Sequence, residues 1–420
     1  MSEHTERSIF VSTTKSDVVV DPGDPRTWWQ HAYAQKGNWI PTSMQGPDHV
    51  MALLGLPPEV FHFDPVAHVK AVAAVMAYYK VDAAIVAEDV YNFEAEALGQ
   101  KMIYGHAMPT IDFREPFIAT HADLAKLKAP ANWLDHGRVR YYLEVARLMS
   151  EMGSANALFC APFSLAVGLR SYPKLIRDMK RDPAFAHDLF TCLVDEILPS
   201  YLKTAVDYTG IKNWSGADAW AAYPNLTPEL IEEWVVPYSN RLLGNTMKLG
   251  FAGMPIAGGD YCEEDLSKFD PEVLWRTLDA QSHIVAGMPL FILGMGRWQD
   301  YPIEPVVEYL QQFKQKGIPA TVGCSVNARV MRDGPVELVI KTARRFIDKL
   351  GRDFNLSSVS AASTPADTPS HHVHALIAAV HTYGLQPLAE NFDAVPFTVP
   401  ERETFAEYVD KMSNGKGLSF

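Results

Sequence analysis

Two neighbouring carboxylic acids give the clearest chemical signal in this sequence of 420 residues. Glu88 and Asp89 directly follow an apolar run, residues 83–87, which has the length and composition of a buried strand. A carboxyl group at the mouth of an apolar cavity can have a shifted pKa, and it can then transfer a proton or accept a hydrogen bond from a substrate. Asp89 also precedes a helical stretch, residues 91–98, so a helix N-cap is the structural alternative.

Asp218 is a third candidate acid, with the same ambiguity. It lies in the segment Ser-Gly-Ala-Asp-Ala-Trp, residues 215–220, and Gly216 indicates a loop that passes close to another group. Further polar and aromatic residues follow the predicted strands and are expected to contact substrate: Asn92, Trp220, Tyr223, Arg297, Trp298 and Asn327. Arg297 and Trp298 suit a flat aromatic or anionic substrate. Alternatively, Arg297 pairs with Asp300 and Trp298 plugs the top of the fold.

The metal-binding signal is weak. Asp260, Cys262 and Cys324 are the candidates, but their spacing matches no zinc motif, and a single cysteine such as Cys324 is more often a small buried hydrophobic residue. The four cysteines contain no C-x-x-C pair. This pattern favours a reducing compartment over a disulfide framework.

Helices and apolar strands alternate along the chain, and this alternation must position the candidate residues. One helix start is well marked, with Asp64 as N-cap and Pro65 in the first helical position. Seven or eight such units without a G-x-G-x-x-G motif predict an α/β fold, a single (β/α)8 TIM-type barrel. We expect an irregular N-terminal extension over residues 1–45 and the barrel over residues 46–420. Residues that follow the strands would then meet at one end of the barrel.

Composition limits the classes of partner. The chain has 37 Lys and Arg against 50 Asp and Glu, a formal charge of −13, which argues against nucleic-acid binding. No apolar run reaches the length of about 18 residues that spans a membrane, and the polar N-terminus has no signal-peptide core. We therefore expect a cytoplasmic protein without a membrane partner, and the sequence leaves a homodimer open.

Several motifs in order resemble one known superfamily. They include Glu-Asp-Val-Tyr-Asn-Phe-Glu-Ala-Glu-Ala-Leu-Gly at 88–99, Ala-Pro-Phe-Ser-Leu-Ala at 161–166 and Gly-Cys-Ser-Val-Asn at 323–327. Over about residues 60–390 the chain resembles the uroporphyrinogen decarboxylase superfamily, which includes cobalamin-dependent methyltransferases. The resemblance implies a (β/α)8 barrel and aligns Asp89 with the carboxylate that contacts pyrrole nitrogens in the decarboxylases. The arginine-rich N-terminal motif of the decarboxylases is missing, and Ala361 stands where they have a histidine.

The methyltransferase branch is the better match after the first predicted strand. Its zinc motif, His-x-Cys-Gly-Asp, reads Ile-Ala-Gly-Gly-Asp at 256–260, so Zn2+ either has other ligands or is not used. The leading hypothesis is a corrinoid-dependent methyltransferase that demethylates a small, aromatic methyl ether or similar compound. The methyl group passes to cobalamin carried by a separate corrinoid protein, and Asp89, Glu88 or a metal polarises the leaving oxygen.

Two alternatives remain open at this point. The first is a decarboxylase or other lyase that acts on a small carboxylic acid held by Arg297 or Arg329, with a substrate other than uroporphyrinogen. The second is a non-catalytic barrel that binds a tetrapyrrole or a corrinoid.

Overall fold

Local sequence signals determine where helices begin in the computed structural model, which describes residues 20–33, 37–84, 89–153, 157–256, 260–287, 289–361 and 363–420. Helix α4 (Pro65–Tyr79) begins as predicted, because the Asp64 side chain accepts hydrogen bonds from two backbone N–H groups of the first turn. Helix α14 (Pro271–Ser282) begins in the same way at Asp270. In both helices proline occupies the first position, where its missing N–H costs nothing.

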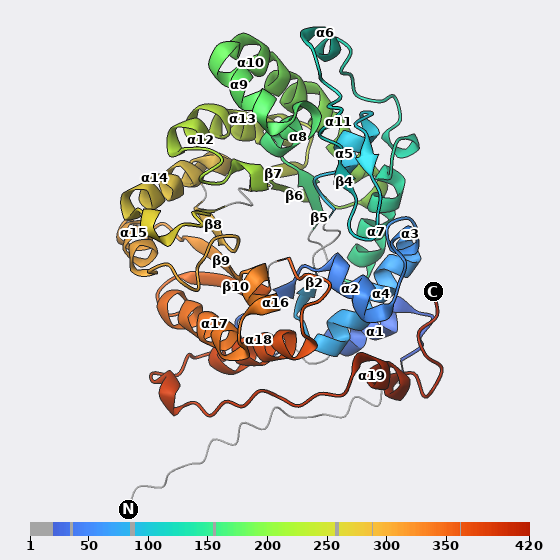
Figure 1. Ribbon diagram of the computed structural model, residues 1–420, viewed down its shortest axis with the longest axis vertical. Helices are drawn as coiled ribbons and strands as arrows, with labels where there is room; N and C mark the ends of the chain where they lie inside the picture. Colours follow the sequence, from blue (N-terminus) through green and yellow to red (C-terminus); the bar gives the residue numbers. More distant parts are fainter. Residues whose placement is uncertain are drawn as a thin grey trace, which may run out of the picture.

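Eight parallel strands of the described residues follow one another in chain order around a ring (Figure 1). They are β1 (Ser43–Met44), β2 (Ala83–Ala84), β5 (Ala157–Cys160), β6 (Asn213–Ala217), β7 (Ala252–Ile256), β8 (Leu290–Leu293), β9 (Thr321–Val326) and β10 (Asn355–Ala361). One arc has the order β2-β1-β10-β9-β8 and the other the order β5-β6-β7. The first strand pairs in parallel with the last, at Met44 and Ala361, and this pairing distinguishes a (β/α)8 barrel from a doubly wound sheet.

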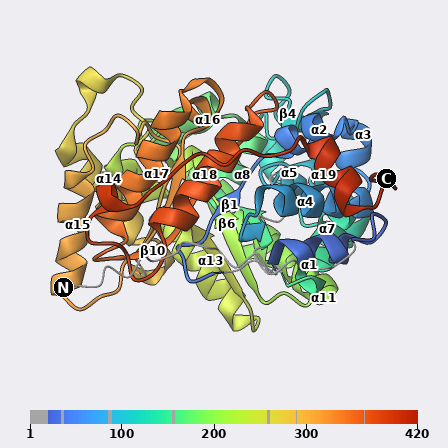
Figure 2. The same cartoon turned by 90° about the horizontal axis from the view of Figure 1, so that it is seen from below.

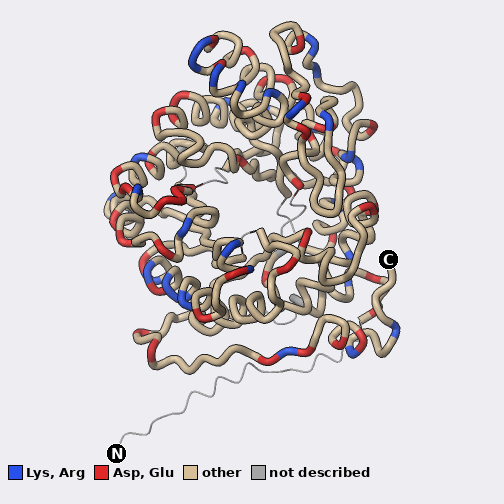
Figure 3. The backbone as a smooth tube through the Cα atoms, viewed as in Figure 1, with Lys and Arg blue, Asp and Glu red and all other residues tan. Residues whose placement is uncertain are grey.

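Helices cover the outside of the ring (Figure 1; Figure 2). Besides α4 and α14 they include α7 (Val139–Glu151), α11 (Leu198–Thr209), α13 (Val236–Lys248), α15 (Glu304–Gln315), α17 (Val336–Leu350) and α18 (Ser370–Tyr383). Their apolar faces and the strands share one hydrophobic core. On the outer helices, basic and acidic residues are interspersed (Figure 3). None of the described helices is both long enough and apolar enough to cross a membrane.

Two long helical segments are interrupted by proline. The first consists of α10 (Pro183–Cys192), a π-helical turn (Leu193–Ile197) and α11, and Pro199 lies in the first turn of α11. The second divides into α12 (Pro228–Trp234) and α13, and Pro237 lies at the start of α13. A proline has no N–H for the helical hydrogen bond, which explains both interruptions.

The sheet begins before residue 46, inside the range expected for the N-terminal extension. Strand β1 has only two residues and no apolar run, so the sequence contains no periodic signal for it. The preceding segment is held at the amino end of β2 by Asp82, which accepts hydrogen bonds from the Thr42 backbone N–H (2.8 Å) and the Trp39 indole N–H (3.0 Å). Helix α1 (Pro25–Tyr33) also belongs to the core, because Trp28 is fully buried.

Long connections follow the first strands and lie at the carboxyl end of the ring. Between β1 and α4 lie α2 (Pro47–Leu54) and α3 (Pro58–Phe61). The connection from β2 to α7 contains α5 (Phe93–Ala97), the hairpin of β3 (Met102–Ile103) and β4 (Thr110–Ile111), and α6 (His121–Leu124). Strand β5 leads into α8 (Pro162–Arg170) and α9 (Tyr172–Arg181), and β9 leads into α16 (Ala328–Asp333). Helix α19 (Phe405–Met412) follows near the end of the chain.

Candidate functional site

Asp218 lies directly after β6 and is fixed through one of its two oxygens. Its Oδ1 accepts the backbone N–H (2.8 Å) and the hydroxyl (2.6 Å) of Ser164, in the first turn of α8. Its Oδ2 is buried and has no hydrogen-bond partner. Burial raises the pKa of Asp218 to about 7, although the Ser164 donors act in the opposite direction. The result is a fixed carboxyl group with one free oxygen and a raised proton affinity.

Glu94, on α5, is a second buried acid and was not among the expected site residues. Its Oε1 accepts the backbone N–H of Cys160 at 2.9 Å, and its buried Oε2 has no partner. Burial raises the pKa of Glu94 to about 8, opposed by the Cys160 N–H and reinforced by the negative charge of Asp89. Glu94 is therefore mainly protonated at neutral pH.

Asp89 faces a cation and is not the N-cap of α5, the alternative that the sequence left open. The capping position belongs to Asn92, whose side-chain amide donates to Asp89 and to the carbonyl oxygen of Pro109 (2.7 Å). The Asp89 carboxylate forms a buried ion pair with Arg138, at 2.5 Å. Burial raises the pKa of Asp89 to about 6, while Arg138 and Asn92 favour its charged form. Asp89 is thus mainly ionised at neutral pH.

Arg138 is a further site residue that the sequence did not reveal, because its position just before α7 has no distinguishing feature. Its side chain is buried, and its Nε donates to Glu96 at 2.9 Å. Its guanidinium carbon lies 4.9 Å from the ring centre of Phe93, 5.5 Å from Tyr104 and 5.8 Å from Phe63. Burial lowers the pKa of Arg138, but the two carboxylates outweigh this effect and raise it. The Nη2 group has no hydrogen-bond partner.

Asp89, Glu94 and Asp218 belong to one electrostatic group, which we call the acid cluster. The charge of Asp89 acts on Glu94, and the charges of Glu94 and Asp218 both raise the pKa of the Cys160 thiol, after burial itself. Tyr91 is within electrostatic range of Cys160 and Asp218. The cluster therefore joins the carboxyl ends of β2, β5 and β6. Glu88, the other predicted acid, lies outside the described residues.

Aromatic side chains border the acid cluster on the side of β6. Trp220 stacks on Tyr172, with ring centres 5.3 Å apart, and meets the exposed Phe113 edge-on at 6.2 Å. The Trp220 backbone N–H donates to the Ser164 hydroxyl at 3.3 Å, so this aromatic group is connected to Asp218 through one serine. Tyr223 lies further along, stacked on Tyr261.

The residues that were expected to contact substrate after β8 and β9 form hydrogen bonds and ion pairs within the protein instead. Arg297 pairs with Asp300 at 2.8 Å, and the buried Trp298 donates its indole N–H to Asp260 at 2.5 Å. The pair with Asp300 is the structural alternative that the sequence left open for Arg297. The Asn327 amide donates to the Met295 carbonyl oxygen at 2.8 Å and caps α16. The polar groups of Arg297, Trp298 and Asn327 therefore give no evidence for a ligand on this side.

The predicted metal candidates do not fit a zinc site. Asp260 accepts four hydrogen bonds, from the N–H groups of Gly294 (2.7 Å) and Gly296 (3.0 Å), the Trp298 indole and the Cys262 thiol (3.0 Å). A carboxylate binds zinc through a free oxygen, whereas both oxygens of Asp260 already accept hydrogen bonds and the Cys262 thiol donates one of them.

Cys324, the third metal candidate, is buried in β9. Burial raises the pKa of its thiol, and the charge of Asp260 raises it further. Among the described residues there is no group of three or more His, Cys, Asp or Glu side chains that could hold a metal ion.

Comparisons with known proteins identify a family and a common fold. A family model described as "Uroporphyrinogen decarboxylase (URO-D)" matches residues 45–256, the range that contains the whole acid cluster. A uroporphyrinogen decarboxylase from Myxococcus xanthus (strain DK1622) is 30% identical over 183 residues, which are 42% of this chain and 49% of that protein. The chain thus matches about half the length of this curated relative. The solved structure of a "methyltransferase from Methanosarcina mazei" has a TM-score of 0.60 at 15% identity and covers 84% of this chain and 97% of that chain, which shows a common fold.

Proposed function

The chain belongs to the uroporphyrinogen decarboxylase (URO-D) family, and from this membership we propose that it is a methyltransferase, the demethylating component of a corrinoid-dependent system. Its substrate is a small methylated compound with an aromatic body, such as a methyl ether, and the acceptor is the corrinoid of a separate protein. The methyltransferase from Methanosarcina mazei with the same fold supports methyl transfer. The observation that carries the proposal is the acid cluster, because removal of a methyl group from oxygen requires a proton for the leaving oxygen.

Asp218 is the proton donor in this proposal. When the methyl–oxygen bond breaks, the bonding electron pair stays on the oxygen, which then takes the proton from Oδ2 of Asp218. Ser164 fixes the other oxygen, and the pKa of about 7 keeps part of the molecules protonated at neutral pH. The partner's corrinoid, when bound at the barrel mouth, supplies the cobalt nucleophile that accepts the methyl group.

Asp89 and Glu94 have different roles because their surroundings differ. Asp89 remains ionised beside Arg138 and can accept a hydrogen bond from a polar substituent of the substrate. Glu94 carries a proton under the same conditions, so the cluster holds fewer negative charges than its three carboxyl groups suggest. Two acids of different pKa in one site are a recurrent arrangement for acid–base work.

The aromatic group beside Asp218 supports a flat substrate. The partly buried rings of Trp220 and Tyr172 and the exposed ring of Phe113 offer apolar faces next to the proton donor. Aromatic faces favour offset stacking with a planar ring. A methylated arene could therefore lie against Trp220 with its oxygen near Asp218.

The test is a methyl-transfer assay with the full chain and a methylated arene. We expect methylation of an added Co(I) corrinoid protein, read from its absorbance spectrum, and no release of the demethylated arene without the corrinoid. The variant Asp218→Asn should lose this activity, whereas Asp265→Asn, on an exposed acid outside the site, should keep it. Demethylation at the same rate without corrinoid would contradict the proposal.

A decarboxylase or other lyase is the second candidate, and one observation favours it. Arg138 is buried beside Asp89 with an unpartnered Nη2, so it could hold the carboxylate of a small acid. Arg297 and Arg329, the arginines expected for this role, are engaged with Asp300 and Glu264. Release of carbon dioxide from a small carboxylic acid in the absence of corrinoid would select this reaction.

A further inference from the structure

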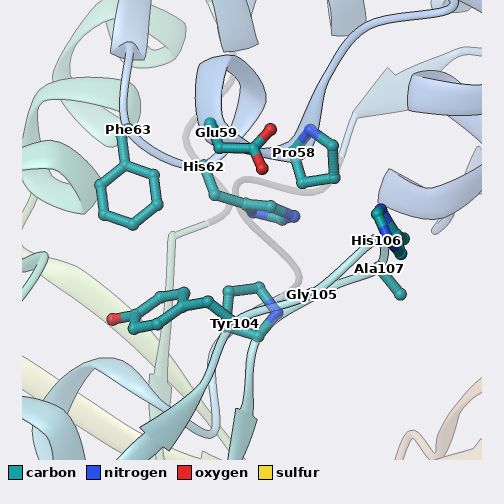
Figure 4. Close-up of a pocket in the computed structure, with 9 residues that line it drawn as sticks. Pro58, Glu59, His62, Phe63, Tyr104, Gly105, His106 and Ala107 are labelled. Carbon is teal, nitrogen blue, oxygen red and sulfur yellow. The ribbon is translucent and has the colours of Figure 1, made fainter.

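A cavity of about 290 Å3 lies between α3 and the segment that follows β3. Its walls include Pro58, His62, Phe63, Tyr104, Ala107 and Pro109. Figure 4 shows the His62 ring extending from α3 toward the loop of Tyr104 to Ala107, with Phe63 on one side. The volume is near the lower limit of about 300 Å3 for ligand pockets, so one small ring would fill it.

The cavity is adjacent to the acid cluster but separate from it. The carbonyl oxygen of Pro109 accepts a hydrogen bond from Asn92, which also binds Asp89. Phe63 and Tyr104 line the cavity, and the guanidinium carbon of Arg138 lies 5.8 Å and 5.5 Å from the centres of their rings. None of the carboxyl groups of the acid cluster lines the cavity.

His62 is a buried polar group of this cavity, which is also lined by Glu59 and His106. The residue is 3% exposed, and its Nε2 has no hydrogen-bond partner. Burial lowers the pKa of His62 to about 3, and the nearby His68 and Arg138 contribute to the decrease. The ring is therefore neutral at physiological pH, and Nε2 offers either one N–H or one lone pair. A hydroxyl group satisfies both tautomers, because it donates and accepts hydrogen bonds.

The other walls favour a neutral aromatic body. Phe63 and Tyr104 are 50% and 47% exposed, with ring centres 5.5 Å apart, and a flat ligand against these two adjacent rings would cover part of their surface. Glu59 lines the same cavity, and behind the rings Arg138 is already paired with Asp89 and Glu96. The net charge around the cavity is negative, which disfavours a carboxylate ligand.

We propose that this cavity binds a small neutral hydroxyaromatic compound of the phenol type, with its hydroxyl group on Nε2 of His62. The ring lies against Phe63 and Tyr104, and Glu59 at the rim rejects anionic analogues. This site does not depend on the methyl-transfer proposal, because it is defined by binding to the chain alone.

The test is isothermal titration calorimetry of the full chain with three probes: phenol, toluene and benzoate. We expect phenol to bind at one site per chain and toluene about tenfold more weakly, because it makes no hydrogen bond to His62. Benzoate should bind more weakly than phenol. The variant Glu59→Gln should strengthen benzoate binding several-fold relative to phenol binding.

Two variants test whether phenol binds in this cavity. Ala107→Trp, on an exposed loop, places a large ring in the cavity and should abolish phenol binding while the thermal transition of the protein remains. His62→Leu should reduce phenol affinity to that of toluene, whereas His283→Leu, on an exposed histidine outside the cavity, should have no effect. Phenol binding that survives Ala107→Trp, or benzoate binding as tight as phenol in the unmodified chain, would overturn the proposal.

Discussion

Ser164 donates both its backbone N–H and its hydroxyl to the same oxygen of Asp218 and leaves the second oxygen of this buried carboxyl group without a partner. The two residues come from consecutive β-to-α connections, 54 positions apart in the chain. The double contact fixes the orientation of the carboxyl group, so that the free oxygen has a defined direction. Such a group is suited to deliver a proton to one position.

Asp218→Asn should reduce methyl transfer about 10²–10⁴-fold, the usual contribution of a positioned acid. Asparagine can still accept the two Ser164 hydrogen bonds, so the fold should be retained while the proton is lost. The rate of methyl-corrinoid formation measures the effect, and Asp265→Asn is the control. An unchanged rate in Asp218→Asn would refute the proton-donor role.

Ser164→Ala should move the pH dependence of the reaction upward. The active form carries the proton, so activity in the unmodified chain falls as the pH rises through about 7. The Ser164 hydroxyl stabilises the charged form, and its removal raises the pKa of Asp218 further. The alkaline limb of the rate profile should therefore shift to higher pH, and a shift to lower pH would contradict this assignment.

Asp218→Asn should also make the protein more stable at alkaline pH. The pKa of Asp218 is about 7 in the folded state and 3.8 in the reference state, so the folded state loses stability as the pH rises from about 4 to 7. Above pH 7 this cost reaches about 4 kcal/mol, since a tenfold change in proton affinity equals about 1.4 kcal/mol. Urea unfolding at pH 4.5 and pH 8 should show that the advantage of the variant grows with pH. If the free energies of unfolding of variant and parent changed with pH in the same way, the pKa of Asp218 would not be raised in the folded state.

Arg138→Gln should destabilise the fold by about 3–5 kcal/mol, because it leaves Asp89 and Glu96 buried without their cation. The loss should be larger at pH 8 than at pH 5, where Asp89 can take up a proton. Arg147→Gln, nine positions further along the chain in α7, is a matched control, since its pairs with Glu144 and Glu151 are more exposed and contribute at most about 1 kcal/mol each. Denaturant unfolding measures the free energy of unfolding of both variants. An equal decrease in the two variants would show that the buried ion pair stabilises the fold no more than the exposed pairs do.

Asp260→Asn should destabilise the protein without any effect on metal content. An asparagine has one acceptor oxygen and cannot satisfy the four donors that Asp260 receives, so at least one buried donor is left unpaired at a cost of about 1–3 kcal/mol. A chelator should leave the thermal transition of the parent protein unchanged. Stoichiometric zinc that depends on Asp260 would require a rearranged loop.

The sequence predicts the fold best where each element carries its own local signal. The start of α4 at Asp64 and Pro65 is confirmed, and the apolar run that begins at Ala83 contains β2. Strand β1 was not predicted, because two residues have no period and this strand exists only through its pairing with β2 and β10. Long-range pairing of this kind leaves no trace in a local pattern.

The site is predictable to a similar extent. Asp89 was selected because it follows an apolar run and Asp218 because Gly216 nearby indicates a close approach, and both lie in the acid cluster. Glu94 and Arg138 lie in or beside helices, where a charged residue normally faces solvent. Their burial depends on partners far along the chain, such as the Cys160 N–H, 66 positions from Glu94. Catalytic and binding roles for all these residues stay predictions until they are tested.

The pairing of the first strand with the last has a consequence for biosynthesis. Ser43 meets Ser360, a residue that the ribosome adds 317 positions later. At typical translation rates this interval takes roughly 15 to 60 seconds, during which β1 has a neighbour on one side only. A nascent chain with such an open edge is exposed to misassembly. Production of this protein should therefore respond to chaperone supply and to the pace of translation more strongly than the stability of the finished molecule suggests.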